Sequence, residues 1–152
     1  MRAALALGLF AAVSCSKEQP ASAAVAVKSA PYQVGLSAKG AYVAGEPASA
    51  VVSIVARDGF HVNPDYPVKF TASNEATVRF ATPSVSLLDS LERVPCEGHA
   101  DETCCARAPI SFSVGEAGAA SVAGTLAFSV CNADQCLIEK VPLSLQLTAA
   151  AK

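Results

Sequence analysis

The chain has 152 residues, of which 52% are hydrophobic and 16% charged, and its formal net charge is −2 at pH 7. This length and hydrophobic content are sufficient for one domain with a buried core. The sequence shows no basic patch and no interleaving of aromatic and basic residues, which excludes the usual pattern of a nucleic-acid-binding protein.

The N-terminus has the pattern of a targeting segment. Arg2 precedes an apolar run from Ala3 to Val13 that is too short to span a bilayer. Small residues precede Cys15 and resemble a bacterial lipobox, although Ala12 stands where that motif usually has Leu. We therefore expect a signal peptide over residues 1–14 and lipidation at Cys15, which would anchor the protein to a membrane. The alternative is an ordinary secretory signal in which Cys15 is incidental.

Residues 15–30 are expected to form a polar, Ala-rich tether between the lipidated cysteine and one domain over residues 31–150. Ser16 differs from the Asp that retains some lipoproteins at the inner membrane, so the outer membrane is slightly preferred. Export places the domain in the cell envelope, facing the periplasm, where disulfides persist. No phosphate-cradling Gly-rich motif is present, and we expect no cofactor.

Seven segments have the composition and alternation of β-strands, and turn residues such as Asp58-Gly59 separate several of them. About seven short strands without a long helical period predict an antiparallel β-sandwich. The predicted strands are Tyr32–Ala38, Ala48–Arg57, Val68–Ala72, Ala76–Thr82, Ala108–Val114, Val122–Cys131 and Leu137–Thr148.

The segment from Ser84 to Arg107 is expected to be irregular, with one or two helical turns near its start. It contains Cys96, Cys104 and Cys105, which form a second group of thiols. We favour a disulfide from Cys96 to Cys104 or Cys105, because vicinal cysteines rarely bond to each other. A metal site that adds His99 as a ligand, and a second redox pair, are the alternatives.

Cys131 and Cys136 flank a four-residue connection between the last two predicted strands. The apolar positions of these strands include Phe128, Val130 and Val141, so both cysteines fall on the opposite, outward parity. Directly opposed residues of neighbouring strands have Cβ atoms about 5 Å apart, from which a small adjustment reaches bonding distance. We therefore predict that Cys131 and Cys136 pair with each other.

This predicted disulfide closes a short loop, so it stabilises the fold by only about 2 kcal/mol. Exposed, strained disulfides are the labile ones, and spacing alone leaves both a hairpin staple and a redox role open. Six cysteines less a lipidated Cys15 leave five, which cannot all pair within the chain. We expect Cys104 or Cys105 to be the unpaired thiol, able to exchange with the Cys131–Cys136 bond if the two groups lie close together.

Three segments resemble the N-terminal periplasmic domain of the thiol:disulfide interchange protein DsbD. They are the hairpin Thr125–Leu143, the segment Asp58–Asn63 and the apolar strand Pro109–Val114, and the resemblance covers roughly Tyr32 to Leu147. It implies an immunoglobulin-like sandwich whose cysteine pair, Cys131 and Cys136, passes electrons to periplasmic or membrane thiol-disulfide proteins. In that family a cap loop shields the pair, and Ser84 to Arg107 occupies roughly its place.

The chain departs from this family at two points in the sequence. It has one residue fewer between Cys131 and Cys136, and Leu137-Ile138-Glu139 replaces a proline-rich tail. Because the chain has no membrane electron channel and no thioredoxin-like domain, we expect its electron donor to be a separate protein.

The sequence thus predicts a lipid-anchored domain that exchanges dithiol for disulfide at Cys131 and Cys136. No basic residue flanks either cysteine in the hairpin, Asp134 disfavours a thiolate, and the attacking cysteine cannot be assigned. His61 is interpreted as a loop residue rather than a catalyst; Phe60 and Tyr66 either pack in the core or shield the cysteine pair. The alternative function is a non-enzymatic lipoprotein sandwich that binds a protein or a metal ion, with structural disulfides.

Overall fold

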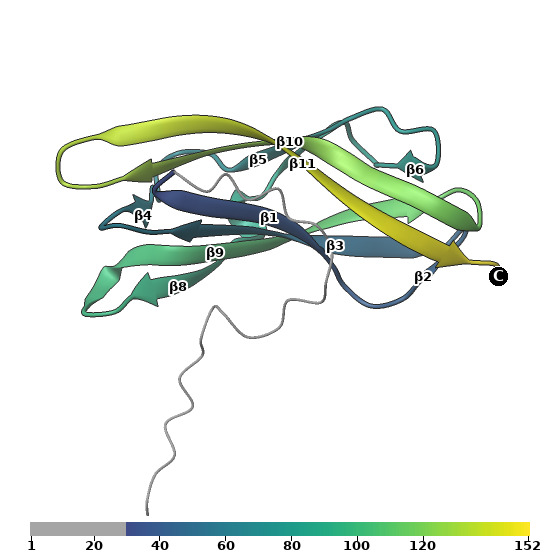
Figure 1. The fold of residues 1–152 in the computed structure, drawn as a ribbon, viewed down its shortest axis with the longest axis horizontal. Coiled ribbons are helices and arrows are strands. Elements are labelled where there is room, and N and C mark those ends of the chain that lie inside the picture. Colours follow the sequence, from purple (N-terminus) through teal and green to yellow (C-terminus); the bar gives the residue numbers. More distant parts are fainter. Residues whose placement is uncertain (1–29) are drawn as a thin grey trace, which may run out of the picture.

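The computed structural model describes residues 30–152, which form two packed layers of β-strands (Figure 1). One layer is built on β9, which pairs with β3 along one edge and with β8 and β6 along the other, while β1 pairs with the far edge of β3. The strands of this layer are β1 (Tyr32–Ala38), β3 (Pro47–Ala56), β6 (Val78–Arg79), β8 (Glu92–Cys96) and β9 (His99–Val114).

The second layer is built on the long antiparallel pair of β10 and β11. β5 pairs with the edge of β10 opposite β11, and β7 follows β5; β2 pairs in parallel with the end of β11. The strands of this layer are β2 (Tyr42–Val43), β5 (Lys69–Ala72), β7 (Ser84–Ser86), β10 (Gly118–Cys131) and β11 (Cys136–Ala150). The fold is therefore an immunoglobulin-like β-sandwich, and all its strand pairs except β2–β11 are antiparallel.

β4 (His61–Val62) joins the two layers at one end of the sandwich, because it pairs with both β9 and β10. It follows a tight turn in which the Phe60 amide donates a hydrogen bond to the Arg57 carbonyl over 3.0 Å. Asp58 and Gly59 have φ values of 55° and 77° there, and an Asp-Gly pair accepts positive φ at both central positions at low cost. This turn redirects the chain from β3 into the space between β9 and β10.

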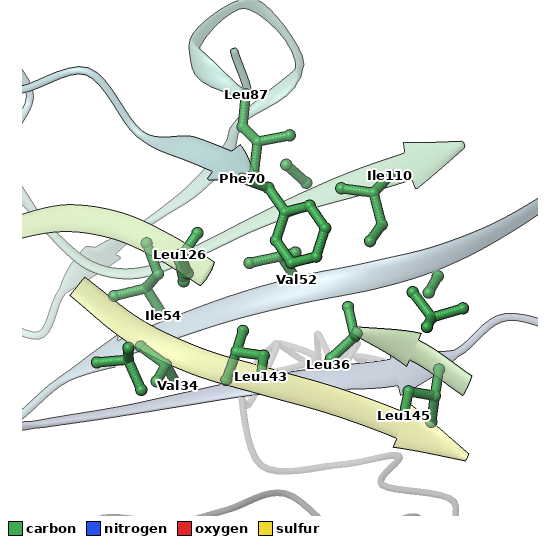
Figure 2. Close-up of a cluster of buried hydrophobic side chains, with 14 of the residues drawn as sticks. Val34, Leu36, Val52, Ile54, Phe70, Leu87, Ile110, Leu126, Leu143 and Leu145 are labelled. Carbon is green, nitrogen blue, oxygen red and sulfur yellow. The ribbon is translucent and has the colours of Figure 1, made fainter. Parts of the chain in front are cut away.

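The core lies between the two layers and consists mainly of aliphatic side chains, as the composition predicts (Figure 2). Along most of β10 and β11 the more buried residues alternate with the less buried ones, so each strand turns one face inward; at the end of β10, residues 128–131 are all buried. Phe70, Ile54 and Leu126 are fully buried at the centre. Burying a side chain of this size is worth about 1.5–3 kcal/mol, so this alternation supplies the main driving force for the fold.

Most long strands are found close to their predicted positions, and β1 has the predicted bounds. Ala76–Thr82 is an exception, since only Val78–Arg79 is strand. The segment expected to be irregular begins with β7 and a short 3-10 helix over Leu88–Ser90 and continues as the β8–β9 hairpin. Within residues 30–152, no helix is long and apolar enough to cross a membrane.

Candidate functional site

Cys131 and Cys136 form a disulfide across the end of the β10–β11 hairpin, which confirms their predicted pairing. They are directly opposed in the strand register, with Cα atoms 4.0 Å apart. The connecting loop is held by Asn132, whose side-chain oxygen accepts hydrogen bonds from the amides of Asp134 and Gln135 over 3.0 and 2.9 Å. These bonds fix the turn, and the turn fixes the register that aligns the two cysteines.

The two sulfur-bearing residues differ in their access to solvent. Cys136 is exposed, whereas Cys131 is only 6% exposed. Both positions have outward parity, and Cys131 is nevertheless buried. At this position β10 is flanked by β11 on one edge and by β4 on the other, so Cys131 lies on a strand with neighbours on both sides. Cys136 lies on β11, which is paired here with β10 on one edge. Cys136 is therefore the more solvent-accessible residue of the pair.

His61 lies beside Cys131 on the edge of β10 opposite Cys136. Directly opposed residues of an antiparallel pair project on the same face with Cβ atoms about 5 Å apart. Cys136, Cys131 and His61 therefore form a row across three adjacent strands. His61 was expected in a loop, but it belongs to β4. Its neighbour Phe60 packs in the core, and Tyr66 is half-buried.

Glu102 of β9 is the acidic partner of His61. The Nδ1 atom of His61 lies 3.9 Å from Oε2 of Glu102, and both side chains are partly exposed. No signal in the sequence indicated this pair, because 41 residues separate the two positions and β4 is too short to show a period. Along the hairpin no basic residue flanks the cysteines, but across the sheet His61 lies beside Cys131.

Cys96 and Cys104 form the second disulfide, with Cα atoms 4.8 Å apart, and close the end of the β8–β9 hairpin. This confirms the favoured interpretation of the segment as a stapled one. Cys105 is buried, and no cysteine among residues 30–152 is a free thiol. The expectation of an unpaired Cys104 or Cys105 is therefore wrong. The described residues contain no group of three or more His, Cys, Asp and Glu placed to hold a metal ion.

Both cysteine hairpins lie at the end of the sandwich marked by β4 (Figure 1). β4 separates them, since Val62 pairs with Thr103 of β9 on one side and with Val130 of β10 on the other. Two strand spacings place β9 and β10 about 10 Å apart here, beyond the roughly 7 Å between Cα atoms that a disulfide spans. A bond between Cys104 and Cys131 would therefore require β4 to move away.

Two further residues lie near the disulfide, one on each strand of the hairpin. Ser129, two residues before Cys131 on the same face of β10, is 1% exposed, and its hydroxyl has no hydrogen-bond partner. Ile138, two residues after Cys136 on β11, is 64% exposed. Cys136 and Ile138 are thus two exposed residues on the same face of β11.

Tyr32 links β1 to β11 close to this end of the sandwich. Burial raises the pKa of its phenol, and the nearby carboxylate of Glu139, which accepts the phenolic hydrogen bond, raises it further. The ring also packs edge-on against Phe128, with centroids 4.9 Å apart. The contact stabilises the strand that follows Cys136.

No family model and no curated protein matches the sequence. Among solved structures, the chain is similar to PapD-like domain 7 of human CEP192, an ASH/PapD-like domain, with a TM-score of 0.31 and 12% identity over 93% of this chain and 97% of that one. Cys15 and the predicted tether lie outside the described residues, apart from Ala30.

Proposed function

We propose that the protein is a thiol-disulfide exchange domain in which Cys131 and Cys136 pass electrons between protein partners. The observation that carries the proposal is the asymmetry of the pair: Cys136 is exposed beside Ile138, and Cys131 is buried beside His61. A structural staple has no need of this arrangement. An exchange site does, because one sulfur must meet the partner while the other leaves and later returns.

The exchange proceeds in two displacements. A partner thiolate attacks the sulfur of Cys136, the bond to Cys131 breaks, and its electron pair remains on the Cys131 sulfur as a thiolate. A second thiol of the partner then attacks the mixed disulfide, which releases Cys136 and leaves the partner oxidised and this domain reduced. In the opposite direction, the thiolate of Cys136 attacks a partner disulfide and Cys131 resolves the intermediate.

We further propose that this exchange takes place in the cell envelope. The apolar run before Cys15 and the polar segment after it support a lipid anchor with a tether, facing the periplasm and with the outer membrane preferred. The resemblance of the cysteine hairpin to the N-terminal domain of DsbD supports partners among periplasmic or membrane thiol-disulfide proteins. Both elements of the proposal rest on the sequence.

Trapping in cells tests the exchange. The Cys131→Ser variant removes the resolving sulfur and keeps Cys136 accessible, so we expect it to accumulate a mixed disulfide, seen as a larger species on non-reducing gels that disappears on reduction. The matched control is Cys136→Ser, in which the remaining Cys131 is buried and traps far less. If neither variant traps a partner, the proposed exchange is wrong.

The reduction potential of the Cys131–Cys136 bond separates this function from a purely structural one. Structural disulfides of secreted proteins have potentials below about −300 mV. We expect a value above that limit for Cys131–Cys136 and a lower one for Cys96–Cys104, measured by equilibration with redox buffers and peptide mass spectrometry. A value below the limit for both bonds would favour the non-enzymatic lipoprotein.

A further inference from the structure

We propose that His61, oriented by Glu102, donates the proton that the Cys131 sulfur takes up when the disulfide opens, and removes that proton when the disulfide closes. This inference rests on the proposed exchange at Cys131 and Cys136, and it adds a proton-transfer group that the hairpin itself lacks. It also gives the β8–β9 hairpin a role at the site, because Glu102 belongs to that hairpin.

The position of His61 follows from the strand register. Cys131 is paired with Cys136 on one edge of β10 and with His61 on the other, so the three side chains project from the same face. Attack on Cys136 pushes the leaving electron pair toward Cys131, which lies next to the imidazole. His61 is thus on the side of the disulfide where negative charge develops, away from the side that the partner approaches.

Glu102 lies on the Nδ1 side of the imidazole. Its Oε2 atom lies 3.9 Å from Nδ1 of His61, an ion-pair distance. With Nδ1 directed toward β9, Nε2 is the ring nitrogen left for the sulfur of Cys131. Cys104, two residues after Glu102, is bonded to Cys96, so the second disulfide holds the strand that carries this carboxylate.

The other charged groups near β4 are placed differently. The elements packed against β4 are β3, β9 and β10. On β9, Asp101 precedes Glu102 and is exposed. In the turn after β3, Asp58 is exposed. The guanidinium of Arg57 donates a hydrogen bond to the side chain of Gln33. β10 contributes Cys131. Glu102 is therefore the charged group that the structure pairs with His61.

A thiolate of a dithiol attacks the Cys136 sulfur, the S–S bond breaks, and the Cys131 sulfur receives the electron pair together with a proton from the imidazolium of His61. The second thiol of the dithiol then displaces Cys136, which takes a proton from solvent. The dithiol is oxidised to a disulfide, Cys131 and Cys136 are reduced, and neutral His61 regains its proton from water.

Reduction by dithiothreitol tests the role of His61 without any protein partner. The role of His61 can therefore be refuted while trapping in cells succeeds, and trapping can fail while the role of His61 is supported. The rate of appearance of each thiol is followed by acid quench, alkylation and peptide mass spectrometry between pH 5 and 9. Each rate is divided by the concentration of dithiothreitol thiolate. With His61 as the proton donor, the rate for Cys131–Cys136 should rise on this scale by about 100-fold as the pH falls, the low end of general acid catalysis.

The variant His61→Gln should lose this rise, and Glu102→Gln should weaken it, because a neutral amide does not hold the imidazolium. His99→Gln is the matched control, since His99 is exposed at the hairpin turn, and should keep the wild-type profile. The Cys96–Cys104 bond in the same sample is an internal reference. A flat wild-type profile, or a rise retained in His61→Gln, would overturn the inference, and the wild-type result stands even if that variant does not fold.

Discussion

His61 is the strand-register neighbour of Cys131, although 70 positions separate them in the sequence. This pairing makes the two cysteines of one short hairpin unlike each other. Cys131 is enclosed between β11 and β4, while Cys136 lies at the exposed start of β11. In the proposed exchange, which spacing left without a direction, this difference favours attack of the partner on Cys136.

Lipidation is the first prediction, and Cys15→Ser should abolish it. The hydroxyl cannot take the place of the acylated thiol, so we expect the variant to move from the membrane fraction to the soluble periplasmic fraction. Fractionation followed by intact mass measurement checks this. Cys136→Ser is the control and should remain with the membranes. An unchanged membrane fraction for Cys15→Ser would contradict the lipid anchor.

The second prediction concerns the packing of β5 against β10. A Cβ atom at Gly124 would lie 2.4 Å from Cζ of Phe70 and 2.5 Å from the Thr71 carbonyl oxygen. Because one of these contacts is to backbone, the strands must separate, and we expect Gly124→Ala to lower the free energy of unfolding by about 1–3 kcal/mol.

Urea unfolding of the oxidised protein measures this effect. Gly115→Ala is the control, since the nearest atom to its added Cβ is the Thr77 carbonyl oxygen at 3.8 Å, an ordinary contact. Its effect should stay within about 0.5 kcal/mol. Equal stability of the two variants would show that β5 does not pack on Gly124 as described.

The third prediction uses the buried hydroxyl of Ser129, which has no hydrogen-bond partner. Removing an unsatisfied buried polar group removes its desolvation penalty, so Ser129→Ala should raise the free energy of unfolding by about 1 kcal/mol. The exposed Ser144→Ala is the control, with an expected change within about 0.5 kcal/mol. A loss of stability in Ser129→Ala would mean that this hydroxyl is satisfied in solution.

The fourth prediction is a pH dependence that originates at Tyr32. Burial and Glu139 raise the pKa of its phenol above the ordinary value of 10.0. The unfolded chain therefore releases this proton first as the pH rises, and the stability that Tyr32 provides is complete below pH 10 and lost as the pH climbs through the raised pKa.

Tyr32→Phe cannot titrate and provides the comparison. Above pH 10 the wild type should lose up to about 1.4 kcal/mol per pH unit more than this variant. At pH 8 the wild type should be the more stable by about 1 kcal/mol, because it keeps the hydrogen bond to Glu139. Urea unfolding between pH 8 and 11 measures both effects, and parallel profiles would contradict them.

The amino-acid sequence alone determined the parts of this protein that depend on neighbours in the chain. Alternation of apolar residues placed β1, β3, β10 and β11, because each of these strands buries one face along its own length. It also determined the Cys131–Cys136 pair, because a four-residue turn leaves little choice of register. The sequence predicted a disulfide from Cys96 but not the two strands that it joins. The pairing of β8 with β9 contains register shifts beside Pro95, and these break the alternation of residues.

Only the tertiary structure decided what surrounds the cysteine pair. β4 has two residues, too few for any periodic signal, and its position depends on the simultaneous pairing of Val62 with β9 and β10. That pairing buries Cys131, brings His61 beside it and brings Glu102 to His61. Contacts of this kind form between segments far apart in the chain, so they are set by the packing of the two layers rather than by local sequence.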